Sequence, residues 1–274
     1  MIKKPKLLIT MGCSYTEGVG CWDLSTIPEG MTNSDVWHEK YLQVYQKNLK
    51  NFHEKGWPNK LCKKLGYDEV LNLGLAGSST SGQMKSFIEK YEKNSFSDYD
   101  VLVVWLLTEP SRFSFYKNGS INNILPNEKY NSDTNIGPAY INFIDDVVLD
   151  PILEQIFYIK SFIDICENRG YGLVISYWEE NSGNHLLNQF KSPHFLYNHP
   201  HNLLPPWPYK DPYGSNLCLH PNENGYEFLA EKIYQGIEKN HSHFIPEIKS
   251  ESFEWNWGGG NTQHEIYFKK NHLQ

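Results

Sequence analysis

The 274-residue chain lacks the features of several special classes of protein. No run approaches the roughly 20 apolar residues of a membrane-spanning helix, and the apolar run KLLITM near the N-terminus is too short for the core of a signal peptide. The 25 Lys and Arg residues form no basic stripe, and the net charge is −7. Since binding to the phosphates of a nucleic acid needs concentrated cations, we expect no nucleic-acid partner. The lack of a signal-peptide core and of a membrane-spanning run leads us to expect a cytoplasmic protein with no membrane partner.

The chain also has few cysteines and histidines at the spacings that are typical of metal sites. The chain has five scattered cysteines and no C-x-x-C pair, so neither a zinc site nor a disulfide framework is indicated. One cluster of histidines could bind a metal, namely His194, His199 and His201. No Cys or carboxylate stands beside them at ligand spacing, and a solvated aromatic loop is the favoured interpretation.

What the chain does have is a composition suited to one sizeable domain, with 39% hydrophobic and 15% aromatic residues. Short apolar runs alternate with segments of helical spacing, which predicts a parallel sheet covered by helices on both faces. The expected strands are 6–11, 70–73, 101–107 and 172–177. The expected helices are 57–65 with Gly66 as its stop, 79–93, a helix from Asp150-Pro151 to Gly170, and 222–238.

Three polar, aromatic stretches interrupt this pattern, near 20–56, 111–147 and 179–219. They are too long for simple connections, so we interpret them as insertions that shape a site. We expect one α/β domain over 1–240 and a C-terminal arm over 241–274.

In open α/β sheets, ligands bind beyond the carboxyl ends of the strands. The informative residues are therefore those that follow each strand: GCSYTEG, NLGLAGSST, TEPSR and YWEEN. The first of these places Ser14 in a glycine-flanked turn after a buried strand. Ser14 could be the N-cap of a helix or an exposed nucleophile.

Taken together, three segments resemble the conserved blocks of the SGNH, or GDSL-type, hydrolases. GCSYTEG resembles G-D-S-x-T-x-G, with Cys13 in place of the Asp. NLGLAGSST resembles the second block, with Asn72 as its leading Asn and Gly77 as its glycine. LCLHPNENG resembles D-x-x-H-P-N-x-x-G, with His220 as the histidine. The order Ser, Gly, His fits the family, and the resemblance implies a three-layer, flavodoxin-like fold.

The chain departs from the family pattern at two positions. The third block, G-x-N-D, normally supplies an oxyanion-hole Asn, but this chain has Leu107, Thr108, Glu109 and Pro110 there. The Asp three positions before the histidine is replaced by Leu217. Asp211 is the first candidate to support His220 instead, with Glu179 and Glu180 as others. The missing Asn could be replaced by Thr108, Arg112 or Ser79.

The resemblance implies ester hydrolysis through an acyl-serine intermediate, with no cofactor and no metal. Ser14 would attack, His220 would carry the proton, and the backbone N–H groups of Ser14 and Gly77 would hold the oxyanion. The substrate would be a small-molecule or glycan ester, and the aromatic loops favour an O-acyl group on a carbohydrate. Two alternatives use the same fold: a non-catalytic binding or structural protein, and an acyltransferase.

Each candidate also has a structural interpretation. His220 could simply precede a capped helix, and Gly77 could simply permit a turn. Cys13 is expected to pack rather than to react. Glu109 could pair with Arg112 or contact substrate. The tryptophans could stack on a sugar or fill the core, in particular Trp57, Trp178, Trp207, Trp255 and Trp257.

Overall fold

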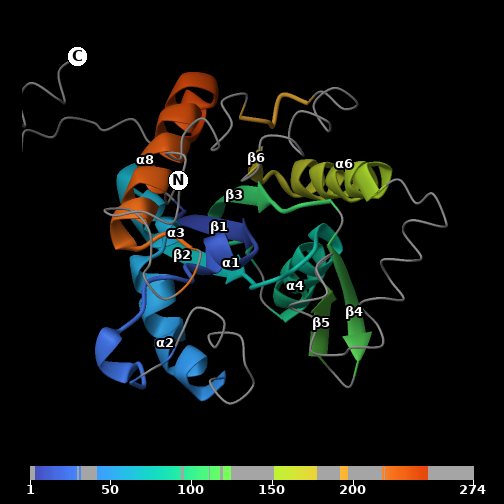
Figure 1. The fold of residues 1–274 in the computed structure, drawn as a ribbon. Coiled ribbons are helices and arrows are strands. Elements are labelled where there is room, and N and C mark those ends of the chain that lie inside the picture. Colours follow the sequence, from blue (N-terminus) through green and yellow to red (C-terminus); the bar gives the residue numbers. More distant parts are fainter. Residues whose placement is uncertain are drawn as a thin grey trace, which may run out of the picture.

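A computed structural model describes residues 4–29, 31, 42–93, 96–110, 112–117, 120–124, 151–177, 192–196, 218 and 220–245. Four parallel strands form its central sheet in the order β2-β1-β3-β6 (Figure 1). They are β1 (Lys6–Gly12), β2 (Glu69–Gly74), β3 (Asp100–Leu107) and β6 (Gly172–Tyr177). All four predicted strands are confirmed, with bounds that differ by at most one residue at either end.

Helices cover both faces of this sheet, as the sequence predicts. α3 (Trp57–Leu65) and α8 (Glu223–Asn240) lie on one face, and α4 (Thr80–Lys93) and α6 (Pro151–Arg169) lie on the other (Figure 1). Gly66 ends α3 in a left-handed conformation. All four predicted helices are therefore confirmed, and the three-layer α/β fold is confirmed with them. The strand order matches the first four positions of the flavodoxin-like order 2-1-3-4-5.

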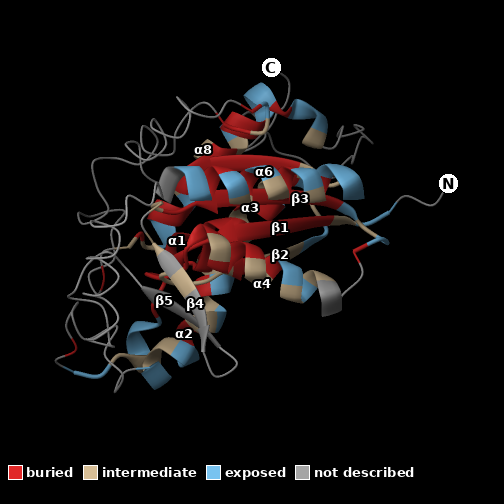
Figure 2. Cartoon of the chain, turned by 90° about the vertical axis from the view of Figure 1, so that its right-hand side faces the viewer, coloured by how far each residue is buried: buried red, intermediate tan, exposed pale blue. Residues whose placement is uncertain are grey.

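Successive side chains of each strand point to opposite faces of the sheet, which explains why two separate cores form. In β3, Leu102, Val104 and Leu106 pack with α3 and α8, whereas the odd-numbered residues pack with α4 and α6. Seven of its eight residues are buried, because a parallel sheet between two helical layers is dry on both faces. Figure 2 shows the buried sheet between helices whose outer faces are exposed.

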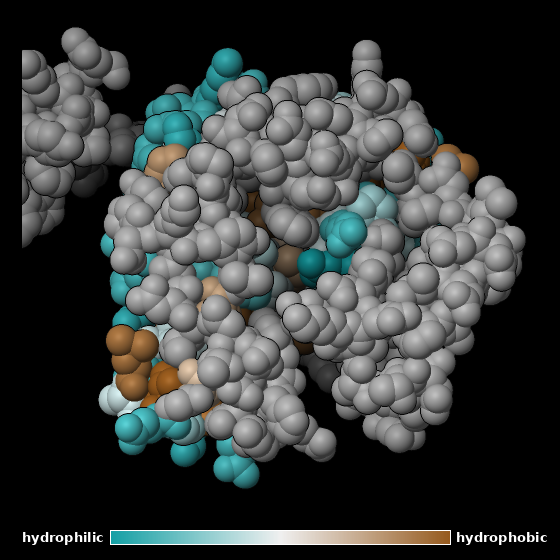
Figure 3. Space-filling view, in the orientation of Figure 1, coloured by the Kyte–Doolittle hydropathy of each residue, from teal (hydrophilic) through white to brown (hydrophobic). Residues whose placement is uncertain are grey.

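Two of the expected insertions contain regular structure that the sequence pattern did not predict. The stretch 20–56 holds a 3₁₀ turn, η1 (Leu24–Thr26), and helix α2 (Leu42–Lys55). The stretch 111–147 begins with an antiparallel hairpin, β4 (Phe113–Lys117) and β5 (Ser120–Ile124). α2 buries Asn48 and Phe52 fully and packs Val44, Tyr45 and Leu49 partly against the core. Over η1 and α2, apolar side chains reach the surface at Leu24 and Leu42 (Figure 3).

The first residues of the expected C-terminal arm pack on the domain. They form a 3₁₀ turn, η5 (Ser242–Phe244), and the Phe244 carbonyl accepts a hydrogen bond from the Tyr67 hydroxyl at 3.2 Å. Residues 246–274 lie outside the described part of the chain, and the division at 240 stays a prediction. Among the helices of the described residues, none combines the length and the apolar character needed to cross a membrane.

Candidate active site

The carboxyl edge of the sheet carries the first predicted site residues. Gly12 lies opposite Gly74 in the β1–β2 register, and Met11 lies opposite Trp105 in β3. Because these strands are parallel and end together, the turns that follow them share one edge. Ser14 opens the short helix α1 (Ser14–Glu17) immediately after β1.

His220 reaches this edge from the far end of the chain. Its Nε2 atom lies 2.8 Å from Oγ of Ser14, across a separation of 206 positions. Ser14 is buried, with 6% of its surface exposed, and the imidazole is half-buried. The two predicted catalytic residues therefore form a hydrogen-bonded pair, which is the geometry required for a serine activated by a base.

Helix α8 fixes the backbone beside His220. Asn222 is its N-cap, and its Oδ1 atom accepts a hydrogen bond from the Gly225 N–H at 3.0 Å. The helix is joined to α3 by a row of ion pairs, among them Lys60 with Glu227 at 3.1 Å. The HPN segment thus both caps the helix, as the structural interpretation expected, and presents His220 to Ser14.

The chain that follows α1 packs directly on the histidine segment. A Cβ atom at Gly20 would lie 2.1 Å from the Pro221 carbonyl oxygen and 3.2 Å from Cβ of His220. Only glycine permits so close an approach, and its φ of +118° also favours glycine. The Tyr15 ring lies 5.2 Å from the imidazole, centroid to centroid. These contacts hold the ring of His220 over Ser14.

The charge state of His220 suits a general base. Burial, with a further contribution from the positive charge of Arg112, lowers the pKa of His220 from 6.5 to about 3. The imidazole is therefore neutral at pH 7. A neutral Nε2 can accept the Ser14 proton, which a protonated imidazole cannot do.

The two predicted oxyanion donors are available at this edge. Within the described part of the chain, the N–H groups of Ser14 and Gly77 donate to no other group. The turn that carries Gly77 is held on the end of β1, where the Gly12 carbonyl accepts bonds from the Leu75 N–H at 3.0 Å and the Ser78 hydroxyl at 3.2 Å. Gly77 has a φ of +74°, so its role in the turn and its role as a donor are compatible.

Thr108 directly follows β3, one position before Glu109, which stands where the family Asn is expected. Its side chain is 2% exposed, and within the described residues its Oγ1 atom has no hydrogen-bond partner. Its carbonyl accepts a bond from the buried Gln155 amide at 3.0 Å. A buried hydroxyl without a protein partner is rare, and this one can donate to a bound group.

The Ser79 hydroxyl has other partners. It bonds to the Ser114 and Ser81 hydroxyls at 2.8 Å each and accepts the Gly82 N–H at 3.2 Å, at the start of α4. The helix expected from Ser79 therefore begins one residue later, with Ser79 before it.

Glu109 and Arg112 are close enough for the ion pair that the sequence suggested. Nε of Arg112 lies 3.9 Å from Oε2 of Glu109, and the Arg112 side chain is the more buried of the two. Cys13 is fully buried in the core, as its packing role requires, with Sγ 4.0 Å from Oγ of Ser14.

Several candidate residues lie outside the described part of the chain: Asp211, Glu179, Glu180, Leu217, His199, His201, Trp178, Trp207, Trp255 and Trp257. Trp57 is fully buried in the core. His194 contacts the Leu173 carbonyl at 3.2 Å and Glu167 at 3.4 Å. Within the described ranges, no three His, Cys, Asp or Glu side chains are grouped to hold a metal ion.

Sequence reasoning missed one buried carboxyl beside the site, that of Glu17. It lies at the end of α1 and is 5% exposed. An acidic residue inside a glycine-flanked turn after a buried strand was an available signal. Tyr45 on α2, whose hydroxyl donates a hydrogen bond to Oε2 of Glu17, gave no signal, because α2 was not predicted.

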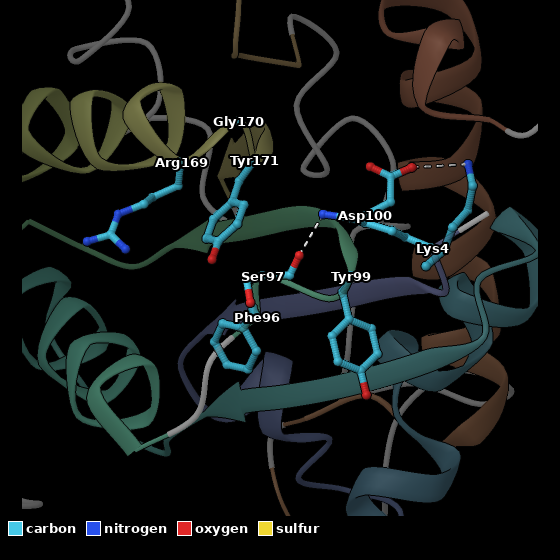
Figure 4. A pocket seen from close by; sticks show the side chains of 9 residues that line it. Lys4, Phe96, Ser97, Tyr99, Asp100, Arg169, Gly170 and Tyr171 are labelled. Carbon is cyan, nitrogen blue, oxygen red and sulfur yellow. Dashed lines mark hydrogen bonds and ion pairs between the residues drawn. The ribbon is translucent and has the colours of Figure 1, made fainter. Parts of the chain in front are cut away.

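A hollow of about 380 Å³ lies at the opposite, amino-terminal edge of the sheet (Figure 4). Lys4, Lys6, Asp100 and Arg169 are among its lining residues. The Lys4 ammonium donates to the Ser97 carbonyl at 2.6 Å, and Lys6 lies 3.8 Å from Asp100. The hollow is separated from Ser14 by the length of the strands and takes no part in the site.

No protein-family model and no curated protein matches the chain. Among solved structures, it is similar to a protein from Desulfitobacterium hafniense DCB-2 described as a candidate lipolytic protein of the G-D-S-L family. The identity is 13% and the TM-score 0.47, over 84% of this chain and 99% of that one.

Two further similar structures are described as carbohydrate esterases. The first has 13% identity and a TM-score of 0.46, over 89% of this chain and 68% of that one. The second, a carbohydrate acetylesterase family member from Sinorhizobium meliloti, has 11% identity and a TM-score of 0.42, over 85% and 98%. In its motifs and its fold, the chain is similar to the SGNH, or GDSL-type, hydrolases.

Proposed function

We propose that the protein is a serine hydrolase that cleaves a carboxylic ester through an acyl-serine intermediate. The observation that carries this proposal is the 2.8 Å contact between His220 Nε2 and Ser14 Oγ. It joins a buried serine to a neutral imidazole, and the N–H groups of Ser14 and Gly77, which donate to no other group among the described residues, lie at the same strand edge.

In the first half-reaction, Ser14 Oγ attacks the ester carbonyl carbon while its proton moves to Nε2 of His220. The carbonyl oxygen becomes an oxyanion, which accepts hydrogen bonds from the N–H groups of Ser14 and Gly77. The protonated imidazole then gives its proton to the alcohol oxygen as the carbon–oxygen bond breaks. The alcohol leaves, and the acyl group remains on Ser14.

In the second half-reaction, His220 removes a proton from water, and the resulting nucleophile attacks the acyl-serine. Collapse of the second tetrahedral intermediate releases the carboxylic acid and returns the proton to Ser14. We propose Thr108 as the third oxyanion donor, since its hydroxyl is buried directly after β3 and has no hydrogen-bond partner among the described residues.

The test is hydrolysis of p-nitrophenyl acetate, followed by a panel that includes acetylated oligosaccharides. The wild-type protein is expected to release p-nitrophenol, and Ser14→Ala and His220→Ala are each expected to lower the rate by about a thousandfold or more. Because the two residues act as a unit, the double variant should be no slower than the slower single variant.

A fluorophosphonate probe provides the matched control, since it reports on the nucleophile without a choice of substrate. It should label the wild-type protein at Ser14 and leave Ser14→Ala unlabelled. If the wild-type protein neither turns over any ester of the panel nor reacts with the probe, the hydrolase proposal is wrong. Binding of an acetylated oligosaccharide without turnover would instead support a non-catalytic binding protein.

A further inference from the structure

Glu17 is a buried carboxyl group for which the proposed reaction has no use. It is the last residue of α1, three positions after Ser14, and 5% of it is exposed. Placing a carboxyl group in a protein interior is unfavourable unless hydrogen bonds compensate. Its contacts therefore indicate what the residue does.

A single oxygen of this carboxyl group joins three segments of the chain. Oε2 accepts the backbone N–H of Ala76 at 2.9 Å, in the turn after β2, and the hydroxyl of Tyr45 at 2.5 Å, on α2. Ala76 is the residue immediately before Gly77. Glu17 thus links the helix that bears the nucleophile to the turn that bears the second oxyanion donor.

The turn and α1 are in direct contact as well as hydrogen-bonded. A Cβ atom at Gly74 would lie 2.2 Å from the Glu17 backbone nitrogen, so the two backbones touch where the strand ends. The Asn72 side chain adds a second tie, since its Nδ2 donates to the Thr16 carbonyl at 2.9 Å. That bond starts in β2, before the turn. The bond from α1 to the turn between Gly74 and Gly77 is made by the side chain of Glu17.

We propose that Glu17 is a positioning residue that holds the Gly77 N–H in register with Ser14 for the oxyanion. The expected loss of rate rests on the proposed function. The expected placement of the turn at Gly77 rests only on the contact between Glu17 and Ala76. A displacement of about 1 Å in such a site costs about a hundredfold in rate. The same reasoning gives α2 a supporting role through Tyr45.

The positioning role does not depend on the charge of Glu17. Burial raises its pKa to about 7, and the bonds from Tyr45 and Ala76 oppose this rise in part. Both the neutral and the ionised carboxyl group keep an oxygen that can accept the Ala76 N–H. A glutamine side chain offers the same acceptor without a charge, and leucine offers none.

The experiment compares Glu17→Gln and Glu17→Leu, with Glu17→Asp as a milder variant whose shorter side chain does not reach Ala76. Glu17→Leu is expected to lower kcat for p-nitrophenyl acetate by about a hundredfold, and Glu17→Asp by about tenfold, each with little change in KM. Gln is expected to stay within about threefold of wild type. Tyr45→Phe should lower kcat by a few-fold, whereas Tyr67→Phe, which loses a hydroxyl bonded to Phe244, should not.

Amide hydrogen exchange of the peptide covering residues 74–79 gives a readout that needs no enzymatic activity. Loss of the acceptor in Glu17→Asp or Glu17→Leu should speed exchange at Ala76 about tenfold or more, and Glu17→Gln should not. Unchanged exchange in Glu17→Asp would overturn the inference even if esters are cleaved. If the wild-type protein proves inactive, the proposed function fails while the exchange data still decide the role of Glu17. Loss of activity in Glu17→Gln equal to that in Glu17→Leu would also contradict it.

Discussion

Nε2 of His220 lies 2.8 Å from Oγ of Ser14, although 206 positions separate the two residues in the chain. The contact exists because both residues stand beside well-anchored backbone. Ser14 opens a helix at the end of β1, which is buried from Leu7 to Gly12, and His220 precedes the N-cap of α8. A pair held from two rigid elements needs little reorganisation before it reacts.

The pH dependence of the reaction should reflect the depressed pKa of His220. Burial and Arg112 lower that pKa from 6.5 to about 3, so the base is already neutral at pH 5. We expect kcat/KM to show no fall as the pH is lowered through 6.5, and the acid limb to lie below about pH 5. The measurement is a profile of kcat/KM between pH 4 and 9.

Glu17→Gln is the control for that profile, because Glu17 has a pKa of about 7. An inflection near pH 7 that vanishes in Glu17→Gln belongs to Glu17. An acid limb centred near 6.5 that persists in Glu17→Gln would show that His220 titrates at its ordinary value, contrary to expectation.

Thr108→Val should reveal the third oxyanion donor. The substitution keeps the shape of the buried side chain and removes a hydroxyl that has no partner within the described residues. If this hydroxyl donates to the oxyanion, kcat should fall by about a hundredfold with little change in KM. Steady-state kinetics on p-nitrophenyl acetate measure both constants. Thr108→Ser, which keeps the hydroxyl, should retain most of the activity, and a fully active Thr108→Val would exclude Thr108 as a donor.

The buried carboxyl of Glu17 should make the folded protein less stable above pH 7 than at pH 4.5. Its pKa is about 7 in the folded protein and near 4.5 in the unfolded chain, so between these values the folded state holds a proton that the unfolded state has lost. The free energy of unfolding therefore falls as the pH rises from 4.5 to 7, by up to about 3 kcal/mol, and this contribution is constant above that window.

Urea unfolding of the wild-type protein and of Glu17→Gln at pH 5 and pH 8 isolates this effect, because all other groups titrate alike in both. The stability of Glu17→Gln relative to wild type should rise by up to about 3 kcal/mol from pH 5 to pH 8. A difference that does not change with pH would mean that Glu17 titrates at its ordinary value.

The sequence by itself determined the four strands, the helices that alternate with them and the class of the fold. Short apolar runs such as 101–107 are long enough for a strand and too short for a helix, and caps such as Gly66 and Asn222 mark helix ends locally. It also pointed to Ser14, Gly77 and His220, since the segments that carry them resemble the three blocks of the SGNH hydrolases. Local chemistry of this kind is readable without the fold.

Only the tertiary structure decided which groups meet. Three relationships are consequences of packing between segments far apart in the chain: His220 faces Ser14, Thr108 is buried with no hydroxyl partner among the described residues, and Glu17 bonds to Ala76. Helix α2 was not predicted because the stretch 20–56 was interpreted as an insertion, although Tyr45, Leu49 and Phe52 recur there at helical spacing. Periodicity reports the burial of a segment, whereas a contact between two polar groups depends on where their backbones lie in space.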